Sequence, residues 1–253
     1  MDFYGISDVG LVRESNQDRF IITVNGNGDI LAAVCDGIGG GKAGDVASEA
    51  TIHYLENVFM KCKKWISSEE LDGWIYAQLR SVNDEVFTKA CMNEKYKGMG
   101  TTLVGLVLSD NVCRVMHVGD SRCYGLINDE FKQLTTDHNY INELLRSGTI
   151  TKEEAIRHPK RNYLTNAIGI FNQIRIDLID VRDFDCLLLC SDGLHGIVND
   201  SKIEMILHQP WSAKRKCELL LEVAKQYGGI DNITVVIVQK GGEANGQYHC
   251  ESL

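Results

Sequence analysis

The stretch ILAAVCDGIGGGKAG, residues 30–44, decides the fold of this chain. It opens with an uninterrupted apolar run, which predicts a buried strand. Asp36 ends the run, and five glycines follow in the next eight positions. A glycine-rich turn after a strand usually lets the backbone approach a ligand closely, and phosphate and metal ions are the common ligands. The stretch therefore predicts a strand and a binding turn that leads into a helix.

Outward from this stretch, short runs rich in Val, Ile and Leu predict the other strands. Together with a run at 29–35, they lie at 2–8, 19–24, 101–108, 112–118, 122–127, 174–181, 185–190 and 232–238. Two helices are expected between the third and fourth runs, and two more at 200–208 and 212–227. This grouping does not follow the strict alternation of a parallel sheet, so it favours an α+β layered sandwich of largely antiparallel sheets.

The two helices after the glycine-rich turn carry apolar stripes. Helix 43–60 is expected to bury a face formed by Ala47, Ala50, Tyr54 and Val58. The next helix opens with Ser67 and Glu70 at the spacing of a capping box. Its stripe consists of Leu71, Trp74, Ile75, Leu79, Val82 and Val86. Both helices are therefore expected to pack on a sheet.

The chain is expected to form one domain over residues 1–240. It has 253 residues, only two prolines and no linker rich in Ser, Pro or Gly. Residues 137–172 combine short helical pieces, a capping box from Thr151 to Glu154 and little β character, which indicates an insertion between strands. Residues 241–253 are expected to be a flexible tail.

Composition narrows the class of partner. The net charge is −9, so the surface as a whole should repel nucleic acid and anionic lipid. The start MDFYGISDVG lacks the features of a signal peptide, and no apolar stretch reaches membrane-spanning length. Nine cysteines without C-x-x-C spacing indicate reduced core residues rather than a disulfide framework. A cytoplasmic monomer that binds neither nucleic acid nor membrane is expected.

Two nucleotide-binding patterns can be tested on the glycines. A Walker loop would need Gly at Asp36 and a hydroxyl residue at Ala43, so that pattern fails twice. The residues Gly39, Gly41 and Gly44 do satisfy the dinucleotide fingerprint, but no second parallel strand with a terminal acidic residue follows. Nucleotide binding at Gly39–Gly44 stays open as a weak alternative.

Four aspartates occupy equivalent places at the ends of apolar runs. They are Asp36, Asp120, Asp192 and Asp231. A single aspartate at such a place is typically a turn residue or a helix cap. Four together would repel one another unless cations offset their charge. Because the ligands are hard oxygens without a His/Cys set, the pattern favours Mg²⁺ or Mn²⁺ over Zn²⁺.

The segment SDVGLVRESNQDRF, residues 7–20, offers a group that could hold phosphate. Arg13 lies there just ahead of the carboxylates Glu14 and Asp18. A guanidinium matches a phosphoryl group bidentately, although an arginine taken alone is more often a solvated surface residue. Two divalent ions a few ångströms apart can share a hydroxide, which suits in-line attack on phosphorus.

A set of ordered motifs carries a family resemblance. Beside residues 7–20, they are VCDGIGGGKAGDVAS (34–48), GMGTTLVGLVL (98–108), HVGDSRCY (117–124), LTTDHN (134–139), LTNAIG (164–169), LLLCSDGLHGIV (187–198) and GGIDNITVVIV (228–238). In this order the set resembles the metal-dependent serine/threonine protein phosphatases of type 2C, especially the compact bacterial members. The resemblance implies a four-layer α-β-β-α sandwich, with paired helices outside two mainly antiparallel sheets and a dinuclear Mn²⁺ or Mg²⁺ centre at one end.

The resemblance also implies a role for each matching ligand. Asp36 would bridge the two ions, and the Gly37 carbonyl would bind one of them. Asp192 and Asp231 would bind the other ion, and Asp18 would act through water.

Further expectations follow from the same resemblance. Arg13 would bind the substrate phosphate, and Asp120 with Asp192 would hold a third, weaker ion. Residues 137–172 would form a flap subdomain that influences substrate choice.

The sequence departs from the family pattern at three places. Ile38 stands where some members have a proposed general-acid histidine, so no general acid is assigned. Asn166 replaces a common arginine, which could alter flap anchoring or peptide affinity, and Gly41 replaces a residue that is often His, Asn or Glu. None of these changes removes an expected metal ligand.

Other titratable residues near the motifs have plainer interpretations. His138 and His195 are expected to be hydrogen-bonded structural residues, because the site is built on carboxylates. A basic cluster could attract a phosphopeptide to the flap or could belong to a solvated loop. It consists of Arg157, His158, Lys160 and Arg161.

The sequence thus predicts a protein phosphatase that hydrolyses phosphoserine and phosphothreonine by direct attack of a water or hydroxide bridging two ions. It would act on phosphoproteins and oppose a serine/threonine kinase, whose own phosphorylated form is an expected substrate. The alternative is a non-catalytic, metal-stabilised module that binds phosphoproteins or a kinase. The complete set of expected ligands argues against that alternative.

Overall fold

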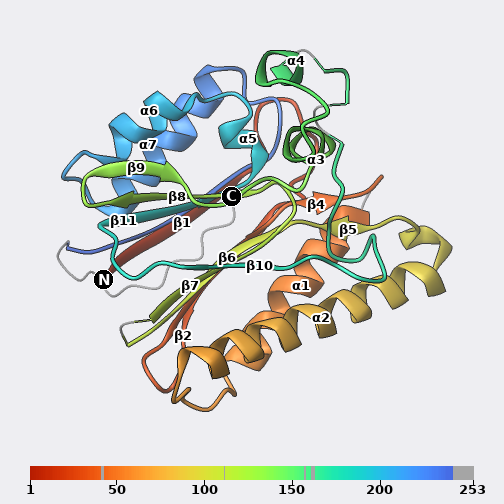
Figure 1. The fold of residues 1–253 in the computed structure, drawn as a ribbon, viewed down its shortest axis with the longest axis horizontal. Coiled ribbons are helices and arrows are strands. Elements are labelled where there is room, and N and C mark those ends of the chain that lie inside the picture. Colours follow the sequence, from red (N-terminus) through yellow and green to blue (C-terminus); the bar gives the residue numbers. More distant parts are fainter. Residues whose placement is uncertain (41–42, 111, 157, 161–162, 242–253) are drawn as a thin grey trace.

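Two five-stranded antiparallel sheets form the centre of the structure, a computed structural model that describes residues 1–40, 43–110, 112–156, 158–160 and 163–241 (Figure 1). The first sheet has the strand order β1 (Asp2–Asp8), β12 (Ile233–Gln239), β11 (Cys186–Cys190), β8 (Arg122–Ile127) and β9 (Glu130–Gln133). The second has the order β10 (Asp177–Asp180), β7 (Val112–Val118), β6 (Leu103–Ser109), β3 (Ile30–Cys35) and β2 (Arg19–Val24). A small third sheet pairs β4 (Gly37–Ile38) with β5 (Gly100–Thr101).

Helices cover the outer face of each large sheet (Figure 1). The long pair α1 (Ala43–Phe59) and α2 (Ser68–Met92) lies on the second sheet, while α6 (Asp200–Leu207) and α7 (Ala213–Gln226) lie on the first. The shorter pieces are η1 (Glu94–Tyr96), α3 (Tyr140–Arg146), α4 (Lys152–Ile156) and α5 (Asp192–His195). The four-layer α-β-β-α order expected from the resemblance is confirmed.

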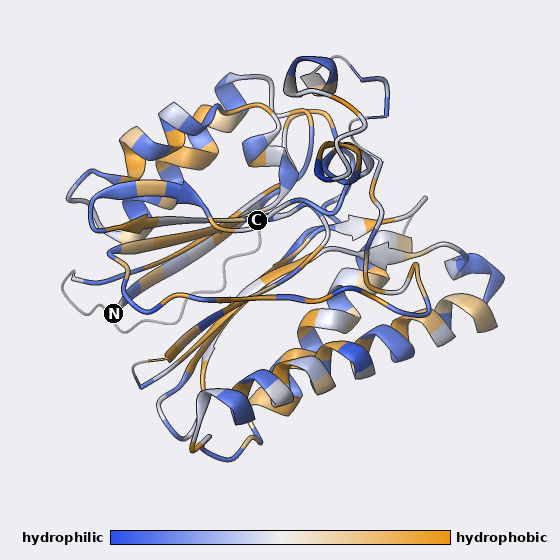
Figure 2. Ribbon diagram, viewed as in Figure 1, coloured by the Kyte–Doolittle hydropathy of each residue, from blue (hydrophilic) through white to orange (hydrophobic). Residues whose placement is uncertain are grey.

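Strand β3 shows why its sequence is continuously apolar. Leu31, Ala33 and Cys35 pack toward α1 and α2, whereas Ala32 and Val34 pack between the two sheets. Because alternate side chains of a strand point to opposite faces, a strand with cover on both faces needs apolar residues at every position. Figure 2 shows the same hydrophobic colouring along the central strands of both sheets.

The expected strands and long helices are all present, with ends shifted by a few residues. The sequence did not predict β4 or β9, because the first is only two residues long and the second is largely exposed. The run expected at 101–108 is divided between β5 and β6. The short helices expected within 137–172 are α3 and α4, and the Thr151–Glu154 capping box forms in both directions. Some residues singled out in the sequence lie outside the described part of the chain, namely Gly41, Arg157, Arg161 and residues 242–253 of the expected tail.

The predicted buried face of α1 was partly wrong. Ala47, Thr51, Leu55 and Phe59 are buried at regular four-residue steps, and the helix also buries Ala43, Gly44, Ser48 and Ile52. Ala50 and Tyr54 are only half-buried, and the Tyr54 hydroxyl donates a hydrogen bond to Gln78 Oε1 of α2 at 3.0 Å. The helix packs on the sheet with one side and on α2 with an adjacent side. The spacing of apolar residues in the sequence does not distinguish these two sides.

None of the helices in the described ranges combines the length and the apolar composition that crossing a membrane requires.

Candidate metal centre and phosphate site

The expected aspartates meet at one end of the two sheets. Asp36 directly follows β3, Asp120 lies two residues beyond β7, and Asp192 opens α5 after β11. Asp231 lies two residues before β12, and Asp18 precedes β2. Antiparallel strands from both sheets thus bring carboxylates to a common place, although Asp18 and Asp231 are more than two hundred positions apart in the chain.

The negative charges of this group act on one another. Burial, followed by the charges of Asp18, Asp192, Asp120 and Asp231, raises the pKa of Asp36 well above its usual value. Burial and the nearby charge of Asp231 likewise raise the pKa of Asp192, while a hydrogen bond with Asp36 opposes this. Burial raises the pKa of Asp120 to about 7. Positive charge bound among these carboxylates would stabilise their ionised forms.

Asp18 is the most buried member, with 2% exposure. The Ser191 hydroxyl donates to its Oδ2 at 2.7 Å, and Thr234 N donates in turn to the Ser191 oxygen at 3.0 Å. Burial raises the pKa of Asp18 to about 7 despite these hydrogen bonds. Ser191 therefore links Asp18 to the start of α5, where Asp192 lies.

This donor set fits divalent cations that prefer oxygen ligands. The aspartates supply hard oxygens in a place where bound positive charge would relieve their repulsion. Among the described residues, the aspartates do not bring three ligand atoms within 4.8 Å of one another.

The backbone around Asp36 is clamped from the neighbouring strand. Asp36 N donates to Thr102 Oγ1 at 3.0 Å, and Thr102 N donates to Asp36 O at 2.9 Å. A Cβ on Gly37 would lie 2.4 Å from Gly44 O, and one on Gly44 would lie 2.7 Å from Gly37 O. These two glycines are required because the turn packs backbone against backbone at the start of α1.

The dinucleotide-binding alternative is wrong for this turn. Strand β3 pairs antiparallel with both β2 and β6, so the parallel strand–helix–strand unit that the fingerprint requires is absent from the described sheets.

Arg13 and Asp231 form an ion pair, with Nη2 of Arg13 2.7 Å from Oδ2 of Asp231. The Arg13 side chain is 55% exposed, so the guanidinium lies at the mouth of the site. Asn232, which the sequence reading did not single out, holds the Arg13 loop in place. Its Oδ1 accepts from Gln17 N at 2.9 Å, and its Nδ2 donates to Val9 O and Ser15 O at 3.0 Å each. The signal for Asn232 was its place beside Asp231 in the GGIDNI motif.

A cleft of about 720 Å³ adjoins Asp120 and Asp192. Its other wall includes Asn139, Ile141 and Asn142 at the start of α3, within the predicted flap segment. The cleft therefore leads from the aspartates toward residues 137–172, as access for a peptide would require.

Arg122 lines the same cleft and was also missed by the sequence reading. It makes a bidentate pair with Asp137, through Nε at 2.9 Å and Nη2 at 2.8 Å, and its Nη1 donates to the Tyr124 hydroxyl. The signal was its position in HVGDSRCY, two residues after Asp120. Since both ends of its guanidinium are occupied, Arg122 braces the cleft wall.

The histidines near the motifs are hydrogen-bonded, as predicted. His195 Nε2 donates to the carbonyl of Asp120 at 3.0 Å. The ring of His138 bonds Gly119 N and Asp177, and the Asn166 amide donates to the same ring at 2.7 Å. Asn166 also accepts from Arg175 N and donates to Arg175 O, so it anchors the end of the flap segment to the residues before β10.

Comparison with known proteins gives a consistent result. A family profile described as Protein phosphatase 2C matches residues 12–226. The serine/threonine phosphatase stp of Listeria innocua is 37% identical over 246 residues, which are 94% of this chain and 98% of that protein. Protein phosphatase PhpP of Streptococcus pneumoniae is 35% identical over 250 residues, which are 96% of this chain and 99% of that protein.

Solved structures match over nearly the whole chain. The crystal structure of the serine/threonine phosphatase Stp1 from Staphylococcus aureus superposes with a TM-score of 0.88 at 32% identity, covering 96% of each chain. That of the serine/threonine phosphatase PstP/Ppp from Mycobacterium tuberculosis has a TM-score of 0.82 at 33% identity, covering 93% of this chain and 96% of that one.

Proposed function

Since the chain belongs to the protein phosphatase 2C family and is a serine/threonine phosphatase, we propose that it hydrolyses phosphoserine and phosphothreonine directly at a centre of two Mn²⁺ or Mg²⁺ ions. The convergence of Asp18, Asp36, Asp192 and Asp231 is the observation that carries this proposal, and burial raises the pKa values of the first three. Family membership also decides against a non-catalytic binding module.

The ligand assignment follows the family pattern. Asp36 and the Gly37 carbonyl would hold one ion, Asp36, Asp192 and Asp231 the other, and Asp18 would contact the centre through water. Asp120 with Asp192 would hold a third, weaker ion. When bound, such ions lower the pKa of a water and neutralise the charge on a phosphoryl group. Aspartates that are rigidly placed by strand ends supply the negative charge that this arrangement needs.

Arg13 would bind the phosphate. Its guanidinium now donates to Asp231 through Nη2 alone, and a phosphoryl group entering the site could accept from two of its N–H groups at once. Because the side chain is exposed, it can turn from the carboxylate to the substrate without disturbing the core. Positioning of this kind reduces the entropy cost of in-line attack.

The peptide carrying the phosphate would lie in the cleft beside Asp120 and α3. We propose that residues 1–240 are one catalytic domain, in which residues 137–172 are the flap that lines this cleft. Phosphorylated proteins are the substrates of a serine/threonine phosphatase, and a kinase and its targets are proposed to be among them. No general acid is assigned, because the side chain of Ile38 cannot donate a proton.

We further propose that the protein acts as a cytoplasmic monomer. All eight cysteines in the described ranges are free, and six of them are buried, which suits a reducing compartment.

Hydrolysis of p-nitrophenyl phosphate tests the two-ion mechanism. The wild type should turn over with Mn²⁺ and stop on addition of EDTA, and Asp192→Asn should lose at least about 100-fold in kcat. Asp183→Asn makes the same chemical change at an exposed residue before β11 and should keep full activity. Turnover that persists in EDTA, or an Asp192→Asn variant as active as the wild type, would contradict the mechanism.

A further inference from the structure

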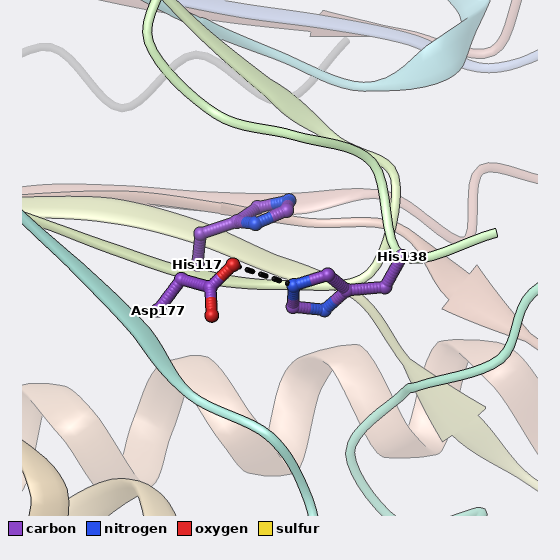
Figure 3. Close-up of side chains that lie close together, drawn as sticks. All are labelled: His117, His138 and Asp177. Atoms are coloured by element: carbon purple, nitrogen blue, oxygen red, sulfur yellow. Dashed lines mark hydrogen bonds and ion pairs between the residues drawn. The ribbon is translucent and has the colours of Figure 1, made fainter. Parts of the chain in front are cut away.

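A second cluster lies on the second sheet, separate from the aspartates of the candidate metal centre. It consists of His117, His138 and Asp177 (Figure 3). Asp177 of β10 pairs directly with His117 of β7, and His138 reaches the same place from the loop before α3. One ligand atom from each residue lies within 4.8 Å of the other two. His117 is fully buried, and neither of its ring nitrogens has a partner among the described residues.

Hydrogen bonds to His138 argue against a metal site here. Gly119 N donates to its Nδ1 at 3.1 Å, and Asn166 Nδ2 donates to the same atom at 2.7 Å. Since Nδ1 accepts twice, the ring proton lies on Nε2, which donates to Asp177 Oδ2 at 2.9 Å. Arg175 also donates to both oxygens of Asp177, at 3.0 and 2.8 Å. A cation would meet a protonated nitrogen and a carboxylate that is already paired.

His138 holds the backbone of Gly119 at both its N–H and its carbonyl group. While Nδ1 of His138 accepts from Gly119 N, the backbone N–H of His138 donates to Gly119 O at 2.7 Å. Gly119 has φ of +111°, and an added Cβ would lie 2.7 Å from Thr102 Cβ. Gly119 therefore has a backbone conformation that no other residue adopts easily. The next residue is Asp120, which faces the cleft.

His138 also joins the two ends of the flap segment. Thr165 N donates to His138 O at 2.9 Å, and Asn166 bonds the ring. The side chain of His138 is only 1% exposed, so its orientation is set by packing as well as by Asp177.

We propose that His138 is a positioning residue, which Asp177 holds as the Nε2–H tautomer so that its Nδ1 clamps Gly119 and directs Asp120 into the cleft. This inference rests on the proposed function, since the effect on activity passes through Asp120. Outer partners of metal ligands commonly change affinity or activity by 10–100-fold when they are removed. An effect of about that size is expected here.

Two substitutions of His138 separate the clamp from a general packing role. Asn places Oδ1 near the position of Nδ1, so His138→Asn keeps the acceptor for Gly119 N–H but loses the bond to Asp177. Gln reaches the position of Nε2 and leaves Gly119 without an acceptor. His138→Gln should therefore speed hydrogen exchange of the Gly119 amide by at least about 10-fold, while His138→Asn stays close to the wild type. His208→Gln, at the exposed end of α6, is the matched control.

A double-mutant cycle then connects the clamp to Asp120. Binding of Mn²⁺ by calorimetry, together with kcat and KM, is measured for His138→Gln, Asp120→Asn and the double variant. If His138 acts through Asp120, its 10–100-fold defect should largely disappear in the Asp120→Asn background. Additive defects, or equal exchange of the Gly119 amide in the Gln and Asn variants, would overturn the proposal.

Failure of the proposed function would look different. In that case Asp120→Asn would change neither Mn²⁺ binding nor turnover, but His138→Gln would still release the Gly119 amide. Should His138→Gln fold poorly, Asp177→Ala and Asp177→Asn provide the same contrast on the partly exposed strand β10. Only the Asn variant keeps an acceptor for the Nε2 proton, and 15N NMR of the His138 ring reads the tautomer directly. A ring protonated on Nδ1 would contradict the clamp.

Discussion

The guanidinium of Arg13 and the carboxylate of Asp231 form an ion pair of 2.7 Å across 218 residues of sequence. Asp231 Oδ1 meanwhile accepts the N–H of Asn232 at 2.8 Å, so both carboxylate oxygens are occupied. The charge of Asp231 in turn raises the pKa of Arg13. The group proposed to hold phosphate thus lies directly on a residue proposed to hold metal.

Replacing Arg13 should lower activity more than stability. Arg13→Ala removes a bidentate donor from an exposed side chain, so kcat/KM on a phosphopeptide should fall by about 10–100-fold. Arg13→Lys should recover only part of this, because an ammonium lacks the planar fork. Steady-state kinetics with Mn²⁺ measure both, and Arg182→Ala, at a side chain 91% exposed, is the control. Equal activity of Arg13→Ala and the wild type would remove Arg13 from the site.

Removing the Asn232 side chain should destabilise the fold. Its amide satisfies Gln17 N, Val9 O and Ser15 O, and the residue is 5% exposed. Asn232→Ala leaves these groups unpaired, so the free energy of unfolding should fall by about 2–4 kcal/mol. Urea denaturation measures the change. Asn57→Ala, on the exposed side of α1, should shift stability by less than about 0.5 kcal/mol, and a similarly small effect at Asn232 would contradict its anchoring role.

Two glycines should respond to alanine in opposite ways. A Cβ on Gly193 would lie 1.9 Å from Asn232 O, so Gly193→Ala forces α5 away from β12 and should cost about 3 kcal/mol or more. Gly73, inside α2, has nothing within 4 Å of an added Cβ, so Gly73→Ala should stabilise by about 0.5–1 kcal/mol. The melting temperatures of the two variants and the wild type measure both effects. A Gly193→Ala variant with the melting temperature of the wild type would show that the backbone near Asn232 O can move aside at little cost in stability.

The metal-free protein should lose stability as pH rises from about 6.5 to 8. Burial raises the pKa of Asp18 and Asp120 from 3.8 to about 7 in the folded state. At pH values between the unfolded-state pKa and the folded-state pKa, the folded state binds more protons than the unfolded state. The free energy of unfolding therefore falls as the pH rises through the folded-state pKa. Below pH 6.5 the buried histidines oppose this slope, since burial lowers the pKa of His117 to about 3 and of His195 to about 4.

Denaturation in EDTA at several pH values should therefore show a loss of about 1–2 kcal/mol across that window. Mn²⁺ should restore more stability at pH 8 than at pH 6.5, because cations compete with protons for the same carboxylates. Asp18→Asn should flatten the profile in EDTA. A stability that does not fall between pH 6.5 and 8 would mean that the aspartates are already ionised without a cation.

Much of the scaffold could be predicted because burial leaves a local trace. The run ILAAVC is apolar at every position since β3 is covered on both faces, and CLLLC of β11 follows the same rule. Strands β4 and β9 leave no such trace, being respectively very short and exposed. The flank of α1 that meets α2 could not be separated from its buried face for a related reason: partial burial gives a weaker pattern.

The sequence indicated the charged residues of the candidate site but not the residues whose hydrogen bonds hold the surrounding loops. Asp36, Asp120, Asp192 and Asp231 stand at strand ends, where a row of carboxylates is visible without coordinates. Asn232, Arg122 and His138 act through partners that lie 15 or more residues away, and their hydrogen bonds depend on how loops meet. Polar residues of this kind are common in turns, so their type alone carries little information.

The stretch at 30–44 shows where sequence ends and tertiary structure begins. By itself the sequence determined that a buried strand ends at a carboxylate and that a glycine-rich turn opens a helix, since hydrophobic periodicity and glycine content are local properties. Only the tertiary structure decided what the glycines do: Gly37 and Gly44 meet backbone to backbone, at a distance that no side chain would permit. Contacts between segments depend on the packing of the whole chain, and packing has no signature in either segment alone.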